Sequence, residues 1–135
     1  MMDESLTLTY EDILLEKMRP KGVVFLSIMV LEGPHITKFI APQIFMDTYL
    51  KNQLYNKDPS LIVPQDGIGF YKWSRFVDGE EITEFVKKNF EAIECESLVL
   101  SLEKKRLTLT VGYKREFSLS EWFFKENPTL DHLFE

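Results

Sequence analysis

The nine residues from Val23 to Leu31 are apolar almost without interruption, and only Ser27 breaks the run. A helix that crosses a bilayer takes roughly 20 apolar residues, so this run is far too short for one. Its β-branched composition favours a strand, and a strand that is wet on one face alternates apolar with polar residues. We therefore expect a strand that is covered on both faces.

Length and charge limit the class of protein further. The 135 residues fit one domain, 1–135, and 44% hydrophobic residues with eleven Phe can fill a core. The net charge of -6 disfavours direct nucleic-acid binding, because a domain that grips phosphates normally shows a basic face. The basic clusters Lys87-Lys88 and Lys104-Lys105-Arg106 are expected to be solvated surface. With one cysteine and no signal peptide, we expect a cytoplasmic protein without a membrane segment.

The order of expected elements predicts the fold. A helix starts at Thr9 and ends before Pro20 and Gly22, and the segment 61–74 is irregular or a short strand. Strands are expected at 23–31 and 35–40, followed by a helix from Pro42 to about Leu54 with Phe45, Tyr49 and Asn52 on one face. Asp78 opens a further helix, in which the apolar residues from Ile82 to Ile93 keep helical spacing. A hairpin of 98–102 and 107–113 comes next, and a last helix is capped by Ser120 and continues or restarts at 128–134. This order predicts an α+β fold, an α/β/α sandwich whose antiparallel sheet carries helices on both faces, as in PAS- and GAF-like sensor domains.

Catalytic and metal-binding patterns are scarce in the sequence. His35 and His132 lie far apart, and neither has a metal-ligand spacing with Cys95, for which a buried and inert thiol is expected. No nucleophile elbow and no phosphate-binding glycine loop is present. We expect no catalytic residue, no metal and no cofactor, and hence no enzyme.

One constellation stands out. An aromatic helix face with Phe45 and Tyr49 leads into Asp58-Pro59, and Trp73 follows fifteen residues after the acid. Flat aromatic surface with a phenol and a carboxylate suits the wall of a small-molecule pocket. The same residues are also explained if Asp58 turns the chain while Tyr49 and Trp73 fill the core.

This run resembles the autoinducer-binding domain of LuxR-type quorum-sensing regulators, in which an aromatic residue, a tyrosine, Asp-Pro and a tryptophan occur at this spacing. The resemblance extends over residues 10 to 135 and includes Val23–Leu31, Glu84-Phe85 and the ending Trp122-Phe123-Phe124. It implies a stand-alone receptor domain for a small acylated signal such as an acyl-homoserine lactone. The ligand-binding residues would be Tyr49 at the acyl carbonyl, Asp58 at the amide N–H, Trp73 at the lactone, Thr110 as a small polar contact, Ser60 supporting the Asp58 corner, and Phe45 and Phe85 beside the acyl chain.

The sequence departs from the family pattern at three places. Phe45 stands where the family usually has a tryptophan, so the indole N–H donor is missing. Ala92 to Glu96 replaces a glycine-containing stretch, and Glu94 and Glu96 either crowd the site or point into water. The first helical region is also shorter than in the family.

Three hypotheses follow, because no helix-turn-helix half is present in these 135 residues. The chain binds and reports a signal. Alternatively, it is a ligand-independent module that pairs with a full-length LuxR-type regulator and inhibits it. The expected assemblies are a homodimer of this chain or a heterodimer with the regulator. In the third hypothesis it is an enzyme or an unrelated sensor on a similar scaffold.

Overall fold

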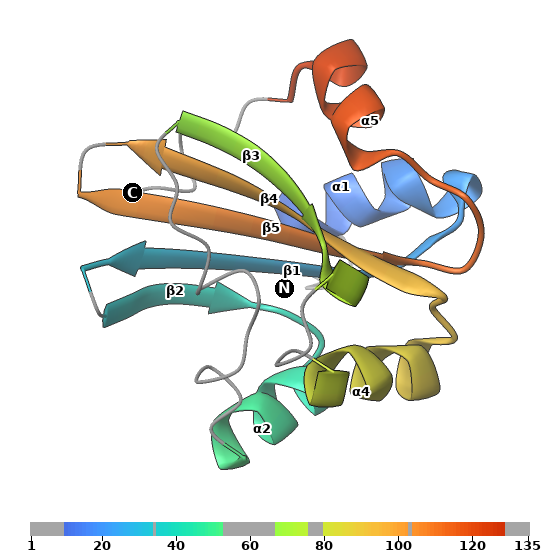
Figure 1. Ribbon diagram of the computed structural model, residues 1–135, viewed down its shortest axis with the longest axis horizontal. Coiled ribbons are helices and arrows are strands. Elements are labelled where there is room, and N and C mark those ends of the chain that lie inside the picture. Colours follow the sequence, from blue (N-terminus) through green and yellow to red (C-terminus); the bar gives the residue numbers. More distant parts are fainter. Residues whose placement is uncertain (1–9, 34, 53–66, 76–79, 103, 129–135) are drawn as a thin grey trace, which may run out of the picture.

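A five-stranded antiparallel sheet with helices on both faces forms the protein (Figure 1). This computed structural model describes residues 10–33, 35–52, 67–75, 80–102 and 104–128. The elements in chain order are α1 (Tyr10–Met18), the 3-10 turn η2 (Arg19–Lys21), β1 (Val23–Glu32), β2 (His35–Ile40), α2 (Gln43–Lys51), β3 (Gly67–Lys72), the 3-10 turn η4 (Trp73–Arg75), α4 (Glu80–Phe90), β4 (Glu94–Leu102), β5 (Lys105–Tyr113) and α5 (Leu119–Glu126). The expected α+β sandwich is confirmed.

The strand order in the sheet is β2-β1-β5-β4-β3, and every pair of neighbours is antiparallel. The apolar run seen in the sequence forms β1, which lies between β2 and β5. Its residues from Phe25 to Val30 are all buried, although their side chains alternate between the two faces of the sheet. The expectation of a strand covered on both faces is confirmed.

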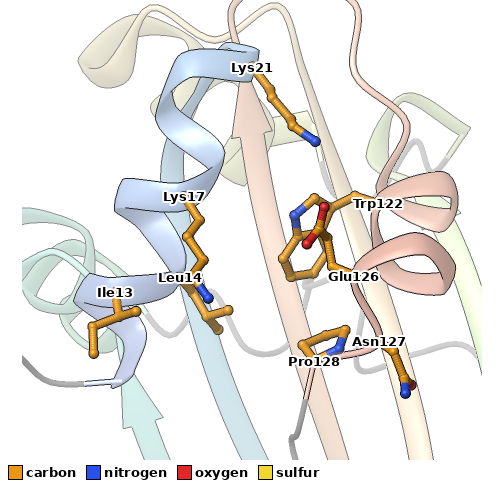
Figure 2. A pocket seen from close by; sticks show the side chains of 8 residues that line it. All are labelled: Ile13, Leu14, Lys17, Lys21, Trp122, Glu126, Asn127 and Pro128. Carbon is orange, nitrogen blue, oxygen red and sulfur yellow. The ribbon is translucent and has the colours of Figure 1, made fainter.

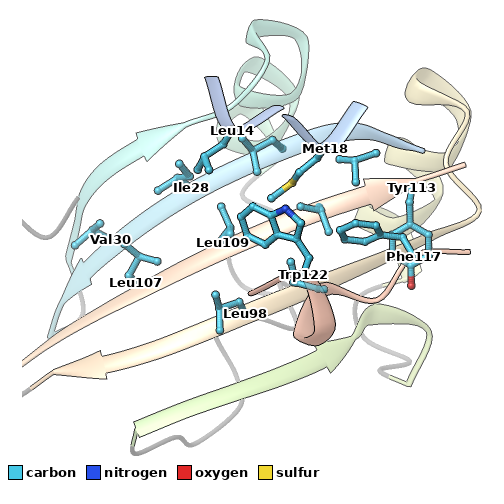
Figure 3. Packing of buried hydrophobic residues seen from close by; sticks show 14 residues of the cluster. Leu14, Met18, Ile28, Val30, Leu98, Leu107, Leu109, Tyr113, Phe117 and Trp122 are labelled. Atoms are coloured by element: carbon cyan, nitrogen blue, oxygen red, sulfur yellow. The ribbon is translucent and has the colours of Figure 1, made fainter. Parts of the chain in front are cut away.

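The two faces of the sheet carry separate cores. On the α1/α5 face, the helices α1 and α5 cover the side chains of Ile28, Leu98 and Leu109, and Figure 3 shows the Trp122 indole among them. Figure 1 shows α2 and α4 on the other face of the sheet, the α2/α4 face, where Phe25 and Met29 of β1 belong to the second buried cluster. The first and last helices of the chain therefore cover one face of the sheet, and the two middle helices cover the other.

Close packing of α4 on the sheet depends on Gly112 of β5. A Cβ atom at this position would lie 3.1 Å from the Cβ of Phe25 and 3.2 Å from the Cγ1 of Val86. A side chain at position 112 would therefore push α4 away from the sheet.

The expected element order lacked one strand. The segment 61–74 contains β3, which pairs with β4 from Gly67↔Ser101 to Lys72↔Glu96. Gly67 and Gly69 have a low propensity for strands, so the sequence pattern of this strand is weak. The backbone hydrogen bonds to β4 stabilise the strand instead. The sheet consequently has five strands where the expected order had four.

The first helix, α1, ends at Met18, before Pro20 and Gly22, as the sequence predicted. The helix itself is confirmed, but Thr9 lies outside the described residues. Pro20 does not stop the chain from coiling, because it lies inside η2, where its missing N–H is tolerated. Gly22 makes the final turn with φ of 103°, a conformation that favours glycine.

The middle helices end earlier than expected. Asn52 caps α2 after Lys51 and is exposed, so it does not share the buried face of Phe45 and Tyr49. The helix α4 ends at Phe90 because Glu91 takes φ of 60°. Ile93, expected on the same helical face, follows the helix and is 55% exposed. The capping residue Asp78 lies outside the described residues.

The hairpin and the last helix also differ in detail. The strand β4 begins at Glu94, four residues before Leu98, and Cys95 is buried near its start as expected. The predicted cap Ser120 is wrong, since Ser118 Oγ accepts a hydrogen bond from the Glu121 backbone N–H at 3.2 Å. The continuation expected from Pro128 onwards, with His132, falls almost wholly outside the described residues.

None of the helices in the described ranges combines the length and the apolar character that a bilayer crossing requires.

Candidate functional site

A row of buried hydroxyl groups crosses the α2/α4 face of the sheet. In the strand register, Ser27 of β1 lies opposite Thr110 of β5, and Thr110 lies opposite Ser97 of β4. The three residues are 7%, 3% and 0% exposed. Hydroxyl groups lose their hydrogen bonds to water on burial, so a row of them on one face of a core needs polar partners.

Trp73 supplies the first partner of this row. Its indole N–H donates to Ser97 Oγ at 2.8 Å, and Ser97 Oγ lies 2.6 Å from Thr110 Oγ1. An indole nitrogen only donates, so Ser97 accepts from it and its own proton is available for Thr110. The opposite direction between the two hydroxyls is equally compatible with the geometry. The chain of hydrogen bonds fixes the Trp73 ring against the sheet.

A second buried polar level lies two residues before Thr110 in β5, at Thr108. Thr108 is 2% exposed and lies opposite Met29 on one side and Val99 on the other. Its Oγ1 is buried and has no hydrogen-bond partner among the described residues. The two levels share one face because side chains on a strand alternate with period two.

Aromatic rings cover this face. Phe45 and Tyr49 of α2 are 2% and 0% exposed, and their ring centroids lie 5.5 Å apart. Phe45 also lies 4.9 Å from Phe25 of β1 and 6.0 Å from Phe85 of α4, and Phe39 of β2 lies 5.0 Å from Tyr49. Edge-on and tilted contacts of this kind stabilise a rigid apolar layer.

The structure brings most of the sequence-predicted site residues to this one face. Phe45, Tyr49 and Trp73 belong to one buried cluster, and Phe85 packs against it. Thr110 is joined to Trp73 through Ser97. Asp58 and Ser60 lie outside the described residues, so their predicted positions stay predictions.

Sequence reasoning missed Ser27, Ser97 and Thr108. The signal was present, because Ser27 is the one polar residue in an apolar run and Thr108 alternates with buried leucines. The alternation of polar and apolar residues along one strand shows on which face of the sheet a hydroxyl lies. Only the register between strands shows that hydroxyls from three strands lie side by side.

No charged side chain belongs to the buried cluster or to the hydroxyl levels within the described part of the chain. Glu96 neither crowds this face nor points into water, and Glu94 is half-buried at the start of β4. Glu96 is 7% exposed and alternates with Ser97, which places it on the α1/α5 face. Glu94 Oε1 accepts hydrogen bonds from the backbone N–H groups of Ser74 and Cys95, at 3.2 and 3.0 Å.

The described ranges hold no group of three His, Cys, Asp or Glu side chains that could bind a metal ion. Cys95 is buried in the aromatic cluster, and His35 is exposed.

A cavity of about 510 Å³ lies on the opposite side of the sheet, between α1 and α5 (Figure 2). Leu14 and Trp122 form its buried part, and Lys17, Lys21 and Glu126 are exposed around it. Charged groups at a wet surface are satisfied by water, whereas buried hydroxyls must find hydrogen-bond partners inside the protein or on a bound molecule. We therefore place the candidate site on the α2/α4 face and not at this cavity.

Comparison with known proteins identifies solved structures that share the fold of this chain. The sequence matches no protein-family model and no curated protein. The structure is similar to Escherichia coli SdiA, with a TM-score of 0.64 at 15% identity over 91% of this chain and 58% of SdiA. It is equally similar, at 16% identity, to SdiA in complex with octanoyl-rac-glycerol, of which it spans 57%. The ligand-binding domain of VqsR from Pseudomonas aeruginosa gives a TM-score of 0.54 at 17% identity, over 87% of this chain and 78% of that one.

The chain thus spans less than three fifths of the SdiA chains that it matches. It has the fold of the LuxR-type autoinducer-binding domains, which confirms the fold that the sequence resemblance implied.

Proposed function

We propose that this chain is a ligand-sensing domain that binds a small, uncharged acylated signal between the α2/α4 face of the sheet and the helices α2 and α4. The observation that carries the proposal is the hydrogen-bonded chain Trp73–Ser97–Thr110 beneath a layer of aromatic rings. A mostly apolar lining with a few placed polar groups is the usual composition of a small-molecule site. The likeness to SdiA in complex with octanoyl-rac-glycerol supports an acyl ligand.

The proposed roles rest on the described positions of Trp73, Thr110, Tyr49, Phe45 and Phe85, and those of Asp58 and Ser60 rest on the sequence resemblance alone. Trp73 walls in the head group, with its ring held by Ser97. Thr110 offers a hydroxyl to the head group, and Tyr49 lies at the acyl carbonyl. Asp58 accepts an N–H of the ligand, with Ser60 supporting that corner. The acyl chain lies against Phe45 and Phe85, which are 6.0 Å apart between ring centroids.

The phenylalanine at position 45 limits which ligand head groups the proposed site can bind. Its ring lies among Phe25, Tyr49 and Phe85 and has no donor for a lactone carbonyl. Ser97 Oγ accepts a hydrogen bond from the Trp73 indole, and Thr110 Oγ1 lies next to Ser97 Oγ, so these two hydroxyls are the polar groups proposed for the head group. An ester or an amide suits these hydroxyls, and an ionised carboxylate does not, because an unpaired buried charge is expensive.

Thermal unfolding with added ligand tests this proposal. The panel consists of acyl-homoserine lactones and monoacylglycerols of graded chain length, with the free fatty acids as charged counterparts. Binding at 100 times Kd adds about 2.7 kcal/mol of stability, which raises Tm by several degrees in a domain of this size. We expect such a shift for certain chain lengths of the uncharged compounds, a reduced shift in Asp58→Ala and Tyr49→Phe, and none with the free acids.

The control variant is Lys17→Ala, which alters the cavity between α1 and α5 and should leave the shift unchanged. An unchanged Tm with every compound, in a protein that unfolds cooperatively, would reject the acyl-signal proposal.

A different observation favours the second function, pairing with a LuxR-type regulator. Phe124 of α5 is 67% exposed and lies 5.8 Å from Phe70 of the edge strand β3 and 5.4 Å from Phe123, between ring centroids. Ile68, on the same strand, is 39% exposed. An exposed aromatic patch beside the edge strand of a sheet is typical of a protein contact.

Light scattering tests this second function. A pairing module forms a dimer, with itself or with the ligand-binding domain of a regulator, without any ligand, and Phe124→Ser should shift the mass towards that of the monomer. A monomer at all concentrations, alone and with the regulator domain, would reject it.

A further inference from the structure

The cavity between α1 and α5 is a feature that the proposed function does not use. Its volume of about 510 Å³ is typical of small-molecule sites, and the sheet separates it from the proposed acyl site. Leu14 and Trp122 form its buried floor and are 3% and 4% exposed. Ile13 also lines the cavity and is 39% exposed, so a ligand with an apolar group gains free energy by covering this side chain.

Three charged side chains line this cavity on opposite walls. Figure 2 shows Lys17 and Lys21 on the side of α1 and Glu126 on the side of α5. All three residues are exposed, and within the described residues no ion pair joins Glu126 to either lysine. The cavity therefore presents two ammonium groups and one carboxylate to a molecule that enters it.

This charge pattern favours a ligand that carries both signs. The two lysines attract a carboxylate, although the net charge of -6 of the whole chain repels anions. A ligand with a carboxylate alone also faces the like charge of Glu126, and a ligand with an ammonium group alone faces both lysines. A zwitterion with an apolar group complements the lysines, the glutamate and Ile13 together.

We propose that the cavity between α1 and α5 binds an α-amino acid with an apolar side chain. The carboxylate of the amino acid lies at Lys17 and Lys21, its ammonium group lies at Glu126, and its side chain lies over Leu14 and Ile13. Water hydrates these exposed charges before binding, so the interaction is weak and reversible, with a Kd on the order of 1 mM. This second site does not depend on the proposed acyl site.

Two-dimensional NMR of the isotope-labelled protein tests this proposal, because the chain has one tryptophan in the core of each face of the sheet. L-phenylalanine and L-leucine are the probes. We expect both to shift the indole N–H signal of Trp122 in a saturable manner and to leave the signal of Trp73 in place. Glycine has no side chain to cover Ile13 and should bind about fivefold more weakly.

Two analogues of L-phenylalanine separate the contributions of its charges. N-acetyl-L-phenylalanine lacks the ammonium group, and phenethylamine lacks the carboxylate. Each should bind about two- to fivefold more weakly than L-phenylalanine, which is the ratio that one exposed charge pair gives.

Variants of the lining residues locate the site. Lys17→Ala and Glu126→Gln should each weaken the binding of L-phenylalanine by about two- to fivefold. Glu126→Gln should also remove most of the difference between L-phenylalanine and its N-acetyl analogue, which a general loss of structure would not do. The matched control is Lys125→Ala, which removes an exposed charge of α5 outside the cavity and should bind as the parent protein does.

Three results would overturn the proposal. The first is a Trp122 signal that stays in place up to the solubility limit of L-phenylalanine. The second is equal binding of L-phenylalanine and N-acetyl-L-phenylalanine to the parent protein, because the cavity is then a site for simple anions. The third is binding that is unchanged in both Lys17→Ala and Glu126→Gln, since the amino acid then lies elsewhere. None of these results bears on the acyl-signal proposal, which the thermal-unfolding panel tests separately.

Discussion

The two faces of the sheet are built from the same strands but from different kinds of side chain. On the α1/α5 face, β5 presents Leu107, Leu109 and Val111, all fully buried. On the α2/α4 face, the same strand presents Thr108, Thr110 and Gly112, which are also buried. Burial alone therefore does not separate the two faces.

The difference is one of chemistry. Aliphatic side chains gain free energy from burial and need no partner, so the leucines and the valine that β5 presents to the α1/α5 face are explained by stability, although Glu96 and the Tyr113 hydroxyl are also buried on that face. Hydroxyl groups gain little from burial and require hydrogen bonds, and the α2/α4 face holds Ser27, Ser97, Thr108 and Thr110. A face that gives up stability to keep such groups buried is where a ligand is expected. Three substitutions test this contrast, from the largest expected effect to the smallest.

Leu109→Ala should have the largest effect. Leu109 is 0% exposed and lies opposite Ile28 and Leu98 in the middle of the sheet. Removing a buried leucine side chain costs about 2–5 kcal/mol, because a cavity remains. Urea unfolding measures the loss, and Thr110→Ala serves as the matched variant on the other face with a smaller expected loss. Equal losses for the two variants would remove the distinction between the faces.

Trp73→Phe should have an intermediate effect. The change removes the N–H that donates to Ser97 Oγ at 2.8 Å and replaces a buried indole with a smaller ring. We expect a loss of about 1–3 kcal/mol, from the hydrogen bond and the lost volume together.

The matched control for this change is Trp122→Phe on the α1/α5 face. Trp122 is 4% exposed and lines the cavity between α1 and α5. Urea unfolding of both variants should show the larger loss for Trp73→Phe. If Trp122→Phe costs as much or more, the hydrogen bond to Ser97 adds nothing measurable.

Tyr113→Phe should have the smallest effect at neutral pH. Tyr113 is 2% exposed on the α1/α5 face, and its hydroxyl has no hydrogen-bond partner among the described residues. Removing this hydroxyl should change the free energy of unfolding by less than about 1 kcal/mol, with stabilisation as the expected sign.

The pH dependence of this variant gives a sharper readout. Burial, and next the negative charge of Glu96, raises the pKa of the Tyr113 phenol above its ordinary value. Above about pH 10 the unfolded chain releases this proton while the folded protein keeps it, so stability falls as the pH rises, by up to about 1.4 kcal/mol per unit. Urea unfolding between pH 8 and 11 should show a shallower fall in Tyr113→Phe. Parallel profiles for the two proteins would contradict this assignment.

The fold was largely predictable because it depends on local patterns. The apolar run of β1, the turn at Gly33, the helical spacing of Ile82 and Val86 and the leucine alternation of the hairpin each specify one element. The strand β3 was not specified in this way, because Gly67 and Gly69 hide it and its partner β4 lies some thirty residues later in the chain. The cap of α5 was misplaced for a related reason. Ser118 and Ser120 are both suitable N-cap residues, and the burial of Leu119 decides between them.

By itself, the sequence determined that an α+β sheet protein forms and that Phe45, Tyr49 and Trp73 belong to one region. Both follow from side-chain periodicity and from short spacings along the chain. Only the tertiary structure decided which hydroxyls face one another. Ser27, Ser97 and Thr110 are separated by 70 and 13 residues in the sequence, and the antiparallel register of β1, β5 and β4 aligns them. Register is a property of paired strands, so it also determines that Thr110 has a hydroxyl beside it and that Thr108 has only Met29 and Val99.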